Sequence, residues 1–264
     1  MTPIPTASSG LLYAGGKLLR ADGRAPADMR PIEIIPDYVS SAEGSALIQL
    51  GETRVVCTAS VEDGVPLFRK GLGQGWITSE YAMIPRATQT RTSREATRGR
   101  QGGRTMEIQR LIGRSLRAVT NLKALGERSV WIDCDVLRAD GGTRTASITG
   151  AMVAMGLAFQ KLVALKIIPR VPLNDYVAAL SAGVVGGEML LDLDYSEDSN
   201  ADIDMNVVMT GRGQLVEVQA TAEGRVFSLE DLNRLVEMVR PAIQHLRTVQ
   251  QTILNLNLSD GVKQ

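Results

Sequence analysis

The charges of this chain are segregated along the sequence, and this limits which parts can form a core. Residues 86–117 contain nine arginines, no lysine and only two acids, whereas residues 171–211 contain eight acids and neither Lys nor Arg. Residues 85–103 also lack hydrophobic periodicity, which predicts a long exposed loop. A guanidinium pairs bidentately with phosphate. An arginine-only segment therefore favours a phosphate-rich partner over an ordinary solvated face, which would mix Lys and Arg.

The remaining composition is that of a globular protein. The chain has 264 residues, 44% of them apolar and 22% charged, which predicts a single domain over residues 19–256. Residues 1–18, rich in Pro, Ser and Gly, are predicted to be a disordered extension, and residues 257–264 a frayed tail. Two cysteines cannot form a disulfide framework, and neither a membrane span nor a signal peptide is recognisable. We therefore expect a cytoplasmic protein with no membrane partner.

The apolar pattern predicts strands and helices in mixed order, hence an α+β fold with helices packed on a mixed sheet. Helices are expected from about residue 105, over residues 145–165, and from residue 228 to about 254. The first helix presents three arginines, Arg110, Arg114 and Arg117, on one face, which suits a phosphate-rich partner or an acidic neighbouring subunit. Strands are expected at residues 31–35, 45–50, 53–61, 129–136, 177–185, 188–193, 205–209 and 215–219.

The segment ADGGTRT at residues 139–145 has the features of an anion site. Gly141 and Gly142 stand where a strand passes into a helix, and glycine lets backbone N–H groups approach a ligand closely. The first helical turn adds unpaired N–H donors and the positive end of the helix dipole, and Arg144 adds a guanidinium. The spacing matches neither a P-loop nor a dinucleotide fingerprint. The alternative is an ordinary turn with an incidental arginine.

Residues 192–204 contain six carboxylates, which repel one another unless cations lie nearby. Ligands for Mg²⁺ or Mn²⁺, a protonated general acid and a plain acidic loop all remain open. The single histidine, His245, is predicted to be an ordinary helix residue, which leaves neither a catalytic triad nor a zinc cluster. Arginines, an anion site and carboxylates together favour phosphoryl transfer, because its catalysis depends mostly on positioning and charge stabilisation.

Seven segments together resemble the ribonuclease PH family of bacterial 3′-end exoribonucleases. They are RADGR (20–24), CTASVE (57–62), GWITSEYAMIPRAT (75–88), GRTMEIQRLIGRSLRAV (103–119), DCDVLRADGGTRTASITGA (133–151), EDSNADIDMNVVMT (197–210) and VEVQATAEG (216–224). The resemblance implies a ribosomal protein S5 domain 2-like fold and a homo-hexameric ring built as a trimer of dimers. It also implies phosphorolytic, reversible 3′–5′ trimming of RNA, namely transfer RNA precursors and ribosomal RNA, in which inorganic phosphate is the nucleophile and nucleoside 5′-diphosphates are released.

The resemblance also assigns roles to particular residues. Asp198 and Asp204 match the catalytic carboxylates: one of them would protonate the leaving 3′ oxygen, or both would position Mg²⁺. The phosphate-binding positions are Arg104, Gly142, Thr143 and Arg144, and the loop arginines assigned to RNA binding or ring assembly are Arg86, Arg91, Arg94, Arg98 and Arg100. Arg138 and Ala220 depart from the Gln and Gly expected in the family, at positions outside the catalytic set.

Two other functions fit parts of the pattern. A non-catalytic RNA-binding subunit of an exosome-like ring would share the fold, but such subunits can lack the acidic pair or the phosphate arginines, and this chain has both. A hydrolytic nuclease would use the carboxylates with two metals and would release nucleoside monophosphates without added phosphate. The nucleotide released, and its dependence on phosphate, distinguish these alternatives from phosphorolysis.

Overall fold

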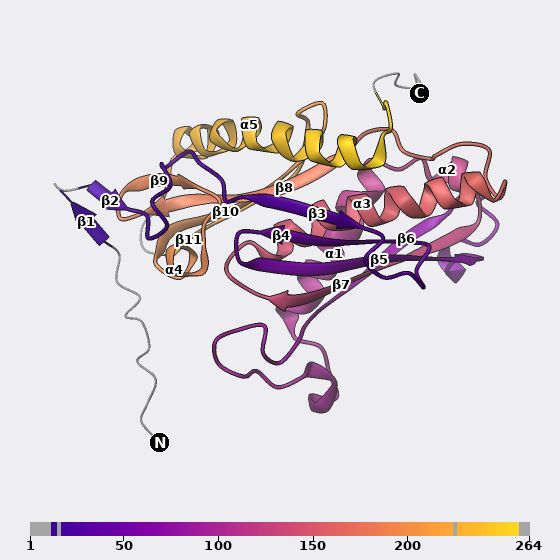
Figure 1. Cartoon of the computed structure of the whole chain (residues 1–264), viewed down its shortest axis with the longest axis horizontal. Helices are drawn as coiled ribbons and strands as arrows, with labels where there is room; N and C mark the ends of the chain where they lie inside the picture. Colours follow the sequence, from indigo (N-terminus) through magenta and orange to yellow (C-terminus); the bar gives the residue numbers. More distant parts are fainter. Residues whose placement is uncertain (1–11, 15–16, 224–225, 259–264) are drawn as a thin grey trace.

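The computed structural model describes residues 12–14, 17–223 and 226–258 (Figure 1). Most of the predicted N-terminal extension and the tail from residue 259 lie outside these residues. Next to the part of the predicted extension that is not described, β1 (Leu12–Ala14) pairs antiparallel with β2 (Lys17–Leu19). Two short apolar runs around a Gly-Gly pair are the sequence signal of such a hairpin.

A five-stranded sheet forms one half of the fold. Its strand order is β3 (Ile32–Pro36), β4 (Gly44–Leu50), β5 (Thr53–Asp63), β7 (Arg128–Arg138), β6 (Trp76–Met83). All neighbours are antiparallel except β6 and β7, which are parallel. Strand β6 was not predicted, although its residues alternate between buried and more exposed positions as a half-buried strand does.

A four-stranded antiparallel sheet forms the other half. Its order is β11 (Leu215–Ala222), β10 (Ala201–Thr210), β8 (Val177–Val185), β9 (Glu188–Leu191). All nine residues of β8 are buried, and two helices, α3 (Thr143–Ala164) and α5 (Leu229–Leu254), pack against this strand. Together with the helices, the two sheets confirm the predicted α+β class.

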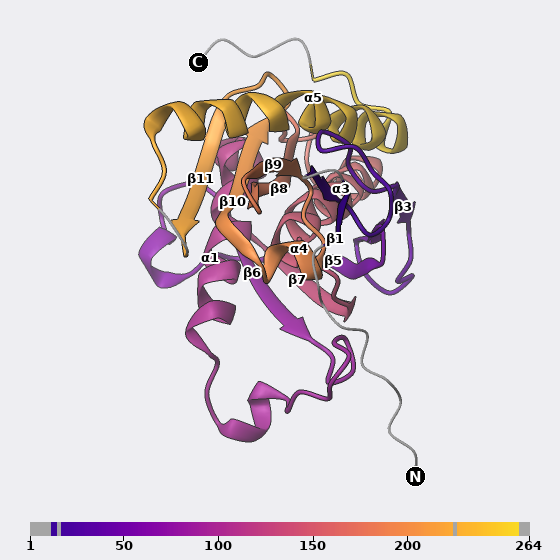
Figure 2. The same cartoon turned by 90° about the vertical axis from the view of Figure 1, so that its left-hand side faces the viewer.

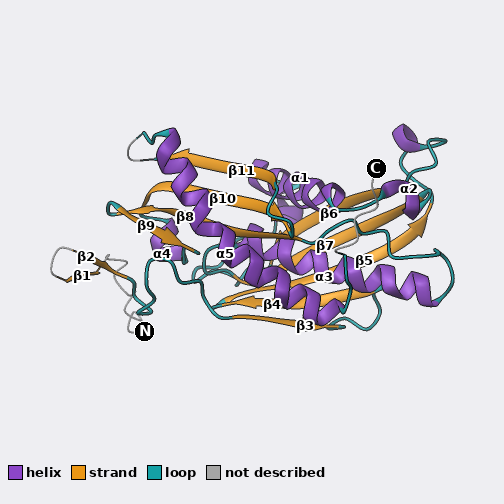
Figure 3. Ribbon diagram, turned by 90° about the horizontal axis from the view of Figure 1, so that it is seen from above, coloured by secondary structure: helices purple, strands orange, loops and turns teal. Residues whose placement is uncertain are grey.

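Helix α3 (Thr143–Ala164) packs against both sheets, mainly through β4, β5 and β8. It is apolar on nearly all sides and long enough to cross a membrane, but 78% of its most apolar window is buried within the protein, as in a core helix. Helix α1 (Gly103–Ala118) lies beside α3 and against β6, and α5 (Leu229–Leu254) packs on β8 (Figures 1 and 3). The remaining helices are short: α2 (Leu122–Leu125) and α4 (Tyr195–Asp198).

The two cysteines lie under α3. Cys57 on β5 faces Cys134 on β7, both are buried, and their sulfurs are 3.8 Å apart and not bonded. The contact with the Cys57 thiol, followed by burial, raises the pKa of the Cys134 thiol. Both residues therefore behave as small apolar core residues.

The position of α3 depends on a close approach to the start of β4. A Cβ added to Gly44 would lie 2.2 Å from the Ala154 carbonyl oxygen and 2.4 Å from the Ala158 nitrogen. Both atoms belong to the helix backbone, which cannot yield locally. Glycine at this position therefore sets the distance between α3 and the five-stranded sheet.

Replacement of Gly44 by Ala is expected to force α3 away from β4 and to lower the free energy of unfolding by about 1–3 kcal/mol, the usual cost of overpacking. Gly103→Ala is the matched control, because an added Cβ there meets nothing within 4 Å and Ala favours a helix. Urea denaturation followed by circular dichroism measures both variants. Equal midpoints for Gly44→Ala and the wild type would show that the contact is not tight.

Candidate active site

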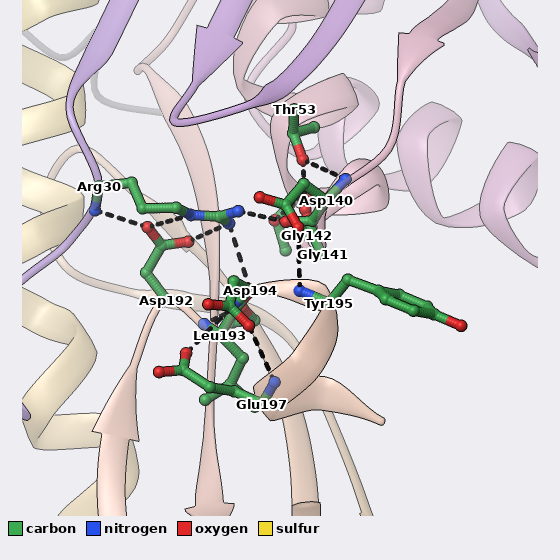
Figure 4. A network of polar contacts seen from close by, with 12 residues as sticks. Arg30, Thr53, Asp140, Gly141, Gly142, Asp192, Leu193, Asp194, Tyr195 and Glu197 are labelled. Atoms are coloured by element: carbon green, nitrogen blue, oxygen red, sulfur yellow. Dashed lines mark hydrogen bonds and ion pairs between the residues drawn. The ribbon is translucent and has the colours of Figure 1, made fainter. Parts of the chain in front are cut away.

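The turn between β7 and α3 brings backbone donors to the surface of the core. Gly141 and Gly142 have φ angles of 74° and 65°, in the left-handed region that favours glycine. A Cβ on Gly141 would lie 2.4 Å from the Leu193 carbonyl oxygen, so this turn touches the segment that follows β9 (Figure 4). Helix α3 begins at Thr143, two residues earlier than predicted, which puts Thr143 and Arg144 in its first turn.

Thr143 points into the protein and bonds to a residue that the sequence analysis missed. Its hydroxyl is 2.8 Å from the hydroxyl of Tyr81 on β6, and both side chains are buried. Burial raises the pKa of Tyr81, although the charges of Arg104 and Arg144 lower it. Tyr81 therefore lies within the field of both arginines and remains a neutral hydrogen-bonding group.

Arg144 is held by two further residues that the sequence did not identify. Its Nη1 donates to Gln219 Oε1 on β11 at 3.1 Å and lies 3.5 Å from Glu107 Oε1 on α1. Gln219 Nε2 in turn donates to Glu107 Oε1 at 3.0 Å. The guanidinium is thus fixed between α1, α3 and the four-stranded sheet, and no sequence spacing could show this because the three residues are far apart in the chain.

Asp198, at the end of α4, and Asp204, on β10, form the acidic part of the site. Burial, followed by repulsion from Asp198, raises the pKa of Asp204 from 3.8 to about 6, against the opposing charges of Arg144 and Arg104. Burial also raises the pKa of Asp198, and the same two arginines oppose it. The structure therefore brings all four charged residues of the predicted site into one electrostatic group.

The other acids of residues 192–204 include three with structural partners, so the cluster is not one metal site. Asp192 pairs with Arg30, Glu197 with Arg20, and Asp194 caps α4. Within the described part of the chain, no group of three or more His, Cys, Asp and Glu side chains could hold a metal.

A cation held by two carboxylates still fits the site. Asp204 Oδ1 is buried and has no hydrogen-bond partner among the described residues. Mg²⁺ commonly takes one or two carboxylates and keeps several waters. Asp198 and Asp204 are the residues that could hold it.

The arginine-rich loop between β6 and α1 projects from the body of the protein (Figures 1 and 2). It contains a short 3-10 helix, Glu95–Arg98, which the sequence analysis did not predict. A groove of about 750 Å³ lies where the loop meets β6, and its lining includes Arg94, Arg100, Arg104 and Tyr81. The groove therefore extends from the loop to Arg104 and Tyr81. Arg86, Arg91, Arg94 and Arg100 are exposed, and the side chain of Arg98 lies outside the described atoms.

The three arginines on one face of α1 do not require a partner subunit. Arg110 is exposed, and Arg114 pairs with Glu217 of the same chain at 3.1 Å. The Arg117 guanidinium lies 4.3 Å from the centre of the Trp76 ring and donates to the Ile77 carbonyl at 2.7 Å. Solvent, cation–π and intrachain contacts therefore satisfy these residues within one chain, so their charges are not evidence for an acidic neighbouring subunit.

The remaining predicted positions make no described polar contact with the residues of the candidate site. Arg138 pairs with Glu52 at 2.5 Å on the surface, and Ala220 lies opposite Met205 in the β10–β11 ladder. His245 is exposed on α5, as an ordinary helix residue would be. None of these three has a described hydrogen bond or ion pair to the residues of the candidate site.

Comparison with known proteins agrees with this geometry. Models of the 3′ exoribonuclease family match residues 28–159 (domain 1) and 175–238 (domain 2). Ribonuclease PH of Moorella thermoacetica is 56% identical over 237 residues, which cover 90% of this chain and 95% of that protein. Ribonuclease PH of Bacillus mycoides is also 56% identical, over 89% of this chain and 97% of its own length.

Solved structures share the fold at lower identity. Rice (Oryza sativa) Rrp46 superposes with a TM-score of 0.72 at 22% identity, over 90% of this chain and all of that one. The Archaeoglobus fulgidus exosome with RNA bound to the active site gives a TM-score of 0.75 at 24% identity, over 87% of this chain and 92% of that one. From the family models and the close relatives, the chain belongs to the ribonuclease PH family of 3′ exoribonucleases and is a phosphorolytic 3′–5′ exoribonuclease.

Proposed function

We propose that orthophosphate, the co-substrate of this enzyme, binds at the start of α3. Arg104 and Arg144 supply guanidinium groups, and backbone N–H groups after Gly142 supply donors at the positive end of the helix. The Thr143 hydroxyl, held by Tyr81, adds a further hydrogen bond. The observation that supports this assignment best is the common field of both arginines at Asp198 and Asp204.

In the proposed reaction, a phosphate oxygen attacks the phosphorus of the last phosphodiester of RNA. A new P–O bond joins the two phosphorus centres, and the bond from phosphorus to the 3′ oxygen of the preceding nucleotide breaks. Asp204, whose pKa of about 6 keeps part of it protonated near neutrality, donates a proton to that 3′ oxygen. A nucleoside 5′-diphosphate leaves, and one phosphate ester is exchanged for a diphosphate, so the reaction is reversible.

The alternative to proton donation by Asp204 is that Asp198 and Asp204 together hold Mg²⁺, for which Asp204 Oδ1, buried and without a partner among the described residues, would offer a ligand. Bound there, Mg²⁺ would neutralise negative charge that develops during the displacement. The arginines act in the same direction, by stabilising the charge on the transferred phosphoryl group.

RNA is proposed to reach the site along the groove beside the arginine-rich loop, with transfer RNA precursors and ribosomal RNA as substrates. Arginines contact phosphates without reading bases, so we expect weak sequence preference. The loop extends beyond the body of the protein, which also supports a role for it in a homo-hexamer built as a trimer of dimers (Figure 2). We also propose that the protein is located in the cytoplasm.

Release of nucleotide from a transfer RNA precursor is expected to require inorganic phosphate and to yield nucleoside diphosphates. Arg104→Ala should raise the KM for phosphate at least about tenfold, because a charge-assisted hydrogen bond to an anion contributes about 1.5–3 kcal/mol. Arg110→Ala, on the same helix, is the control and should leave this KM unchanged. Monophosphate release without phosphate would instead indicate a hydrolytic nuclease, and no shortening of RNA would indicate a non-catalytic subunit.

Asp204→Asn is expected to reduce kcat at least about 100-fold, the lower range for loss of a general acid, with RNA binding nearly intact. The same change should raise the melting temperature above pH 6. A carboxyl whose pKa is raised in the folded state destabilises that state once the carboxyl ionises, so the wild type loses stability as pH rises from about 4 to about 6.

The control for this variant is Asp133→Asn on β7, where burial also raises the pKa of a half-buried carboxyl. Asp133 precedes Cys134, which faces α3, so its own side chain lies on the opposite face of the sheet. The control should keep full activity. Activity assays at saturating phosphate and melting curves at about pH 4.5 and pH 7.5 test both variants. Full activity of Asp204→Asn, or a lower melting temperature at pH 7.5, would contradict the assignment.

Arg91→Ala combined with Arg94→Ala is expected to weaken RNA binding and its salt dependence. The slope of log affinity against log salt should become shallower by about 0.7 for each phosphate of single-stranded RNA that the variant no longer neutralises. Arg240→Ala on α5 is the control. Sedimentation shows whether the oligomer also changes, and an unchanged slope with an unchanged oligomer would contradict both roles of the loop.

A further inference from the structure

Arg30 lies between the two chain segments that form the proposed phosphate site. It precedes β3 and is 3% exposed, and no part of the proposed mechanism uses it. Figure 4 shows its guanidinium between Asp192 on one side and the turn of residues 140–142 on the other. These two segments come from different sheets and are about 50 residues apart in the sequence.

Toward the acidic segment, Arg30 makes a bidentate ion pair. Its Nη2 lies 2.7 Å from Asp192 Oδ1 and its Nε lies 3.0 Å from Asp192 Oδ2, which also accepts from the Arg30 backbone N–H at 2.7 Å. Nη2 donates in addition to the Leu193 carbonyl at 3.3 Å. Asp192 is fully buried and has a φ of 53°, so its unusual backbone conformation needs such partners. The segment fixed here leads directly into α4, which ends at Asp198.

Toward the glycine turn, Arg30 contacts the backbone. Its Nη1 donates to the Asp140 carbonyl, and a Cβ on Gly142 would lie 3.2 Å from Nη2. Thr53 on β5 holds the same turn with a second pair of bonds: its hydroxyl accepts from the Asp140 N–H at 2.9 Å and donates to the Gly141 carbonyl at 2.7 Å. The turn that begins α3 is therefore anchored by two side chains.

Arg30 is not itself placed to bind phosphate. Four of its five N–H donors already have acceptors within the protein, and the Asp192 carboxylate neutralises its charge. Its contacts can therefore affect phosphate binding only through the positions of the turn and of the acidic segment. A displacement of about 1 Å at such a site can cost about 100-fold in rate.

We propose that Arg30 is a positioning residue, which fixes the glycine turn of the phosphate site relative to the segment that carries Asp198, with Thr53 as the second anchor of the turn. The inference rests on the proposed assignment of the phosphate site to the start of α3. It assigns the buried ion pair with Asp192 a role in phosphate binding in addition to its contribution to folding.

The test compares Arg30→Lys with Arg20→Lys. Lysine keeps a positive charge but lacks the fork that contacts Asp192 and Asp140 together. Arg20 is buried in the same cluster and forms an equally short bidentate pair, at 2.7 Å, with Glu197, but its hydrogen bonds in the described structure go to residues outside the turn. Both variants therefore disturb a buried ion pair, and only Arg30→Lys disturbs the turn.

We expect Arg30→Lys to raise the KM for phosphate about tenfold, a typical loss when a group that orients a ligand is removed. Arg20→Lys should leave this KM within about twofold of the wild type, and the KM for RNA should be unchanged in both. Thr53→Val, which keeps the shape and removes both hydrogen bonds, should also raise the phosphate KM. This variant decides the question alone if Arg30→Lys does not fold.

An unchanged phosphate KM in folded Arg30→Lys and Thr53→Val would overturn the proposal. An equal increase in Arg20→Lys would also overturn it, because the cluster would then act only through general stability. Arg104→Ala, measured alongside, separates the two levels of inference. If Arg104→Ala raises the phosphate KM and the Arg30 and Thr53 variants do not, only the positioning role fails; if none of the three changes it, the phosphate site itself is misassigned.

Discussion

The close contact between the Gly141 backbone and the segment after β9 is the constraint on which the site depends. A side chain at this glycine would overlap the Leu193 carbonyl, so the turn before α3 and the acidic segment can meet only because the position has no Cβ. The contact joins the end of the five-stranded sheet to the four-stranded sheet. It thereby brings the first turn of α3 to the strand and helix that carry Asp204 and Asp198.

The charges assembled there serve function, but they lower the stability of the folded protein when no ligand is bound. Two half-buried carboxylates repel each other, and the raised pKa of Asp204 expresses that repulsion together with the cost of burial. Arg144 is meanwhile paired with Glu107 and Gln219, which keep its guanidinium in place when no anion is bound. Arginines held by partners, together with carboxyls whose pKa values are raised, are typical of sites that stabilise a charged transition state.

The arginines of the chain divide into groups that their sequence positions do not distinguish. Arg20 and Arg30 are buried in bidentate ion pairs, and Arg117 stacks on Trp76 as part of the packing. Those of the loop after β6 whose side chains are described are exposed and available to a polyanion. The arginine-rich composition therefore serves the interior as well as the exposed loop, since the planar guanidinium can satisfy several acceptors at once.

The sequence by itself determined the α+β class and most strands and helices, because periodicity and glycine positions are local properties. It singled out the candidate charged residues of the site only through the resemblance to the family. It did not reveal β6, whose parallel pairing with β7 is non-local, nor Tyr81, Gln219 and Arg30, whose contacts join distant segments. It also could not distinguish, among six neighbouring acids, Asp192 and Glu197, which pair with buried arginines, from Asp198 and Asp204, which lie in the field of Arg104 and Arg144. Only the tertiary structure decided this, because the pKa and the role of a carboxyl depend on burial and on partners that the fold brings from elsewhere in the chain.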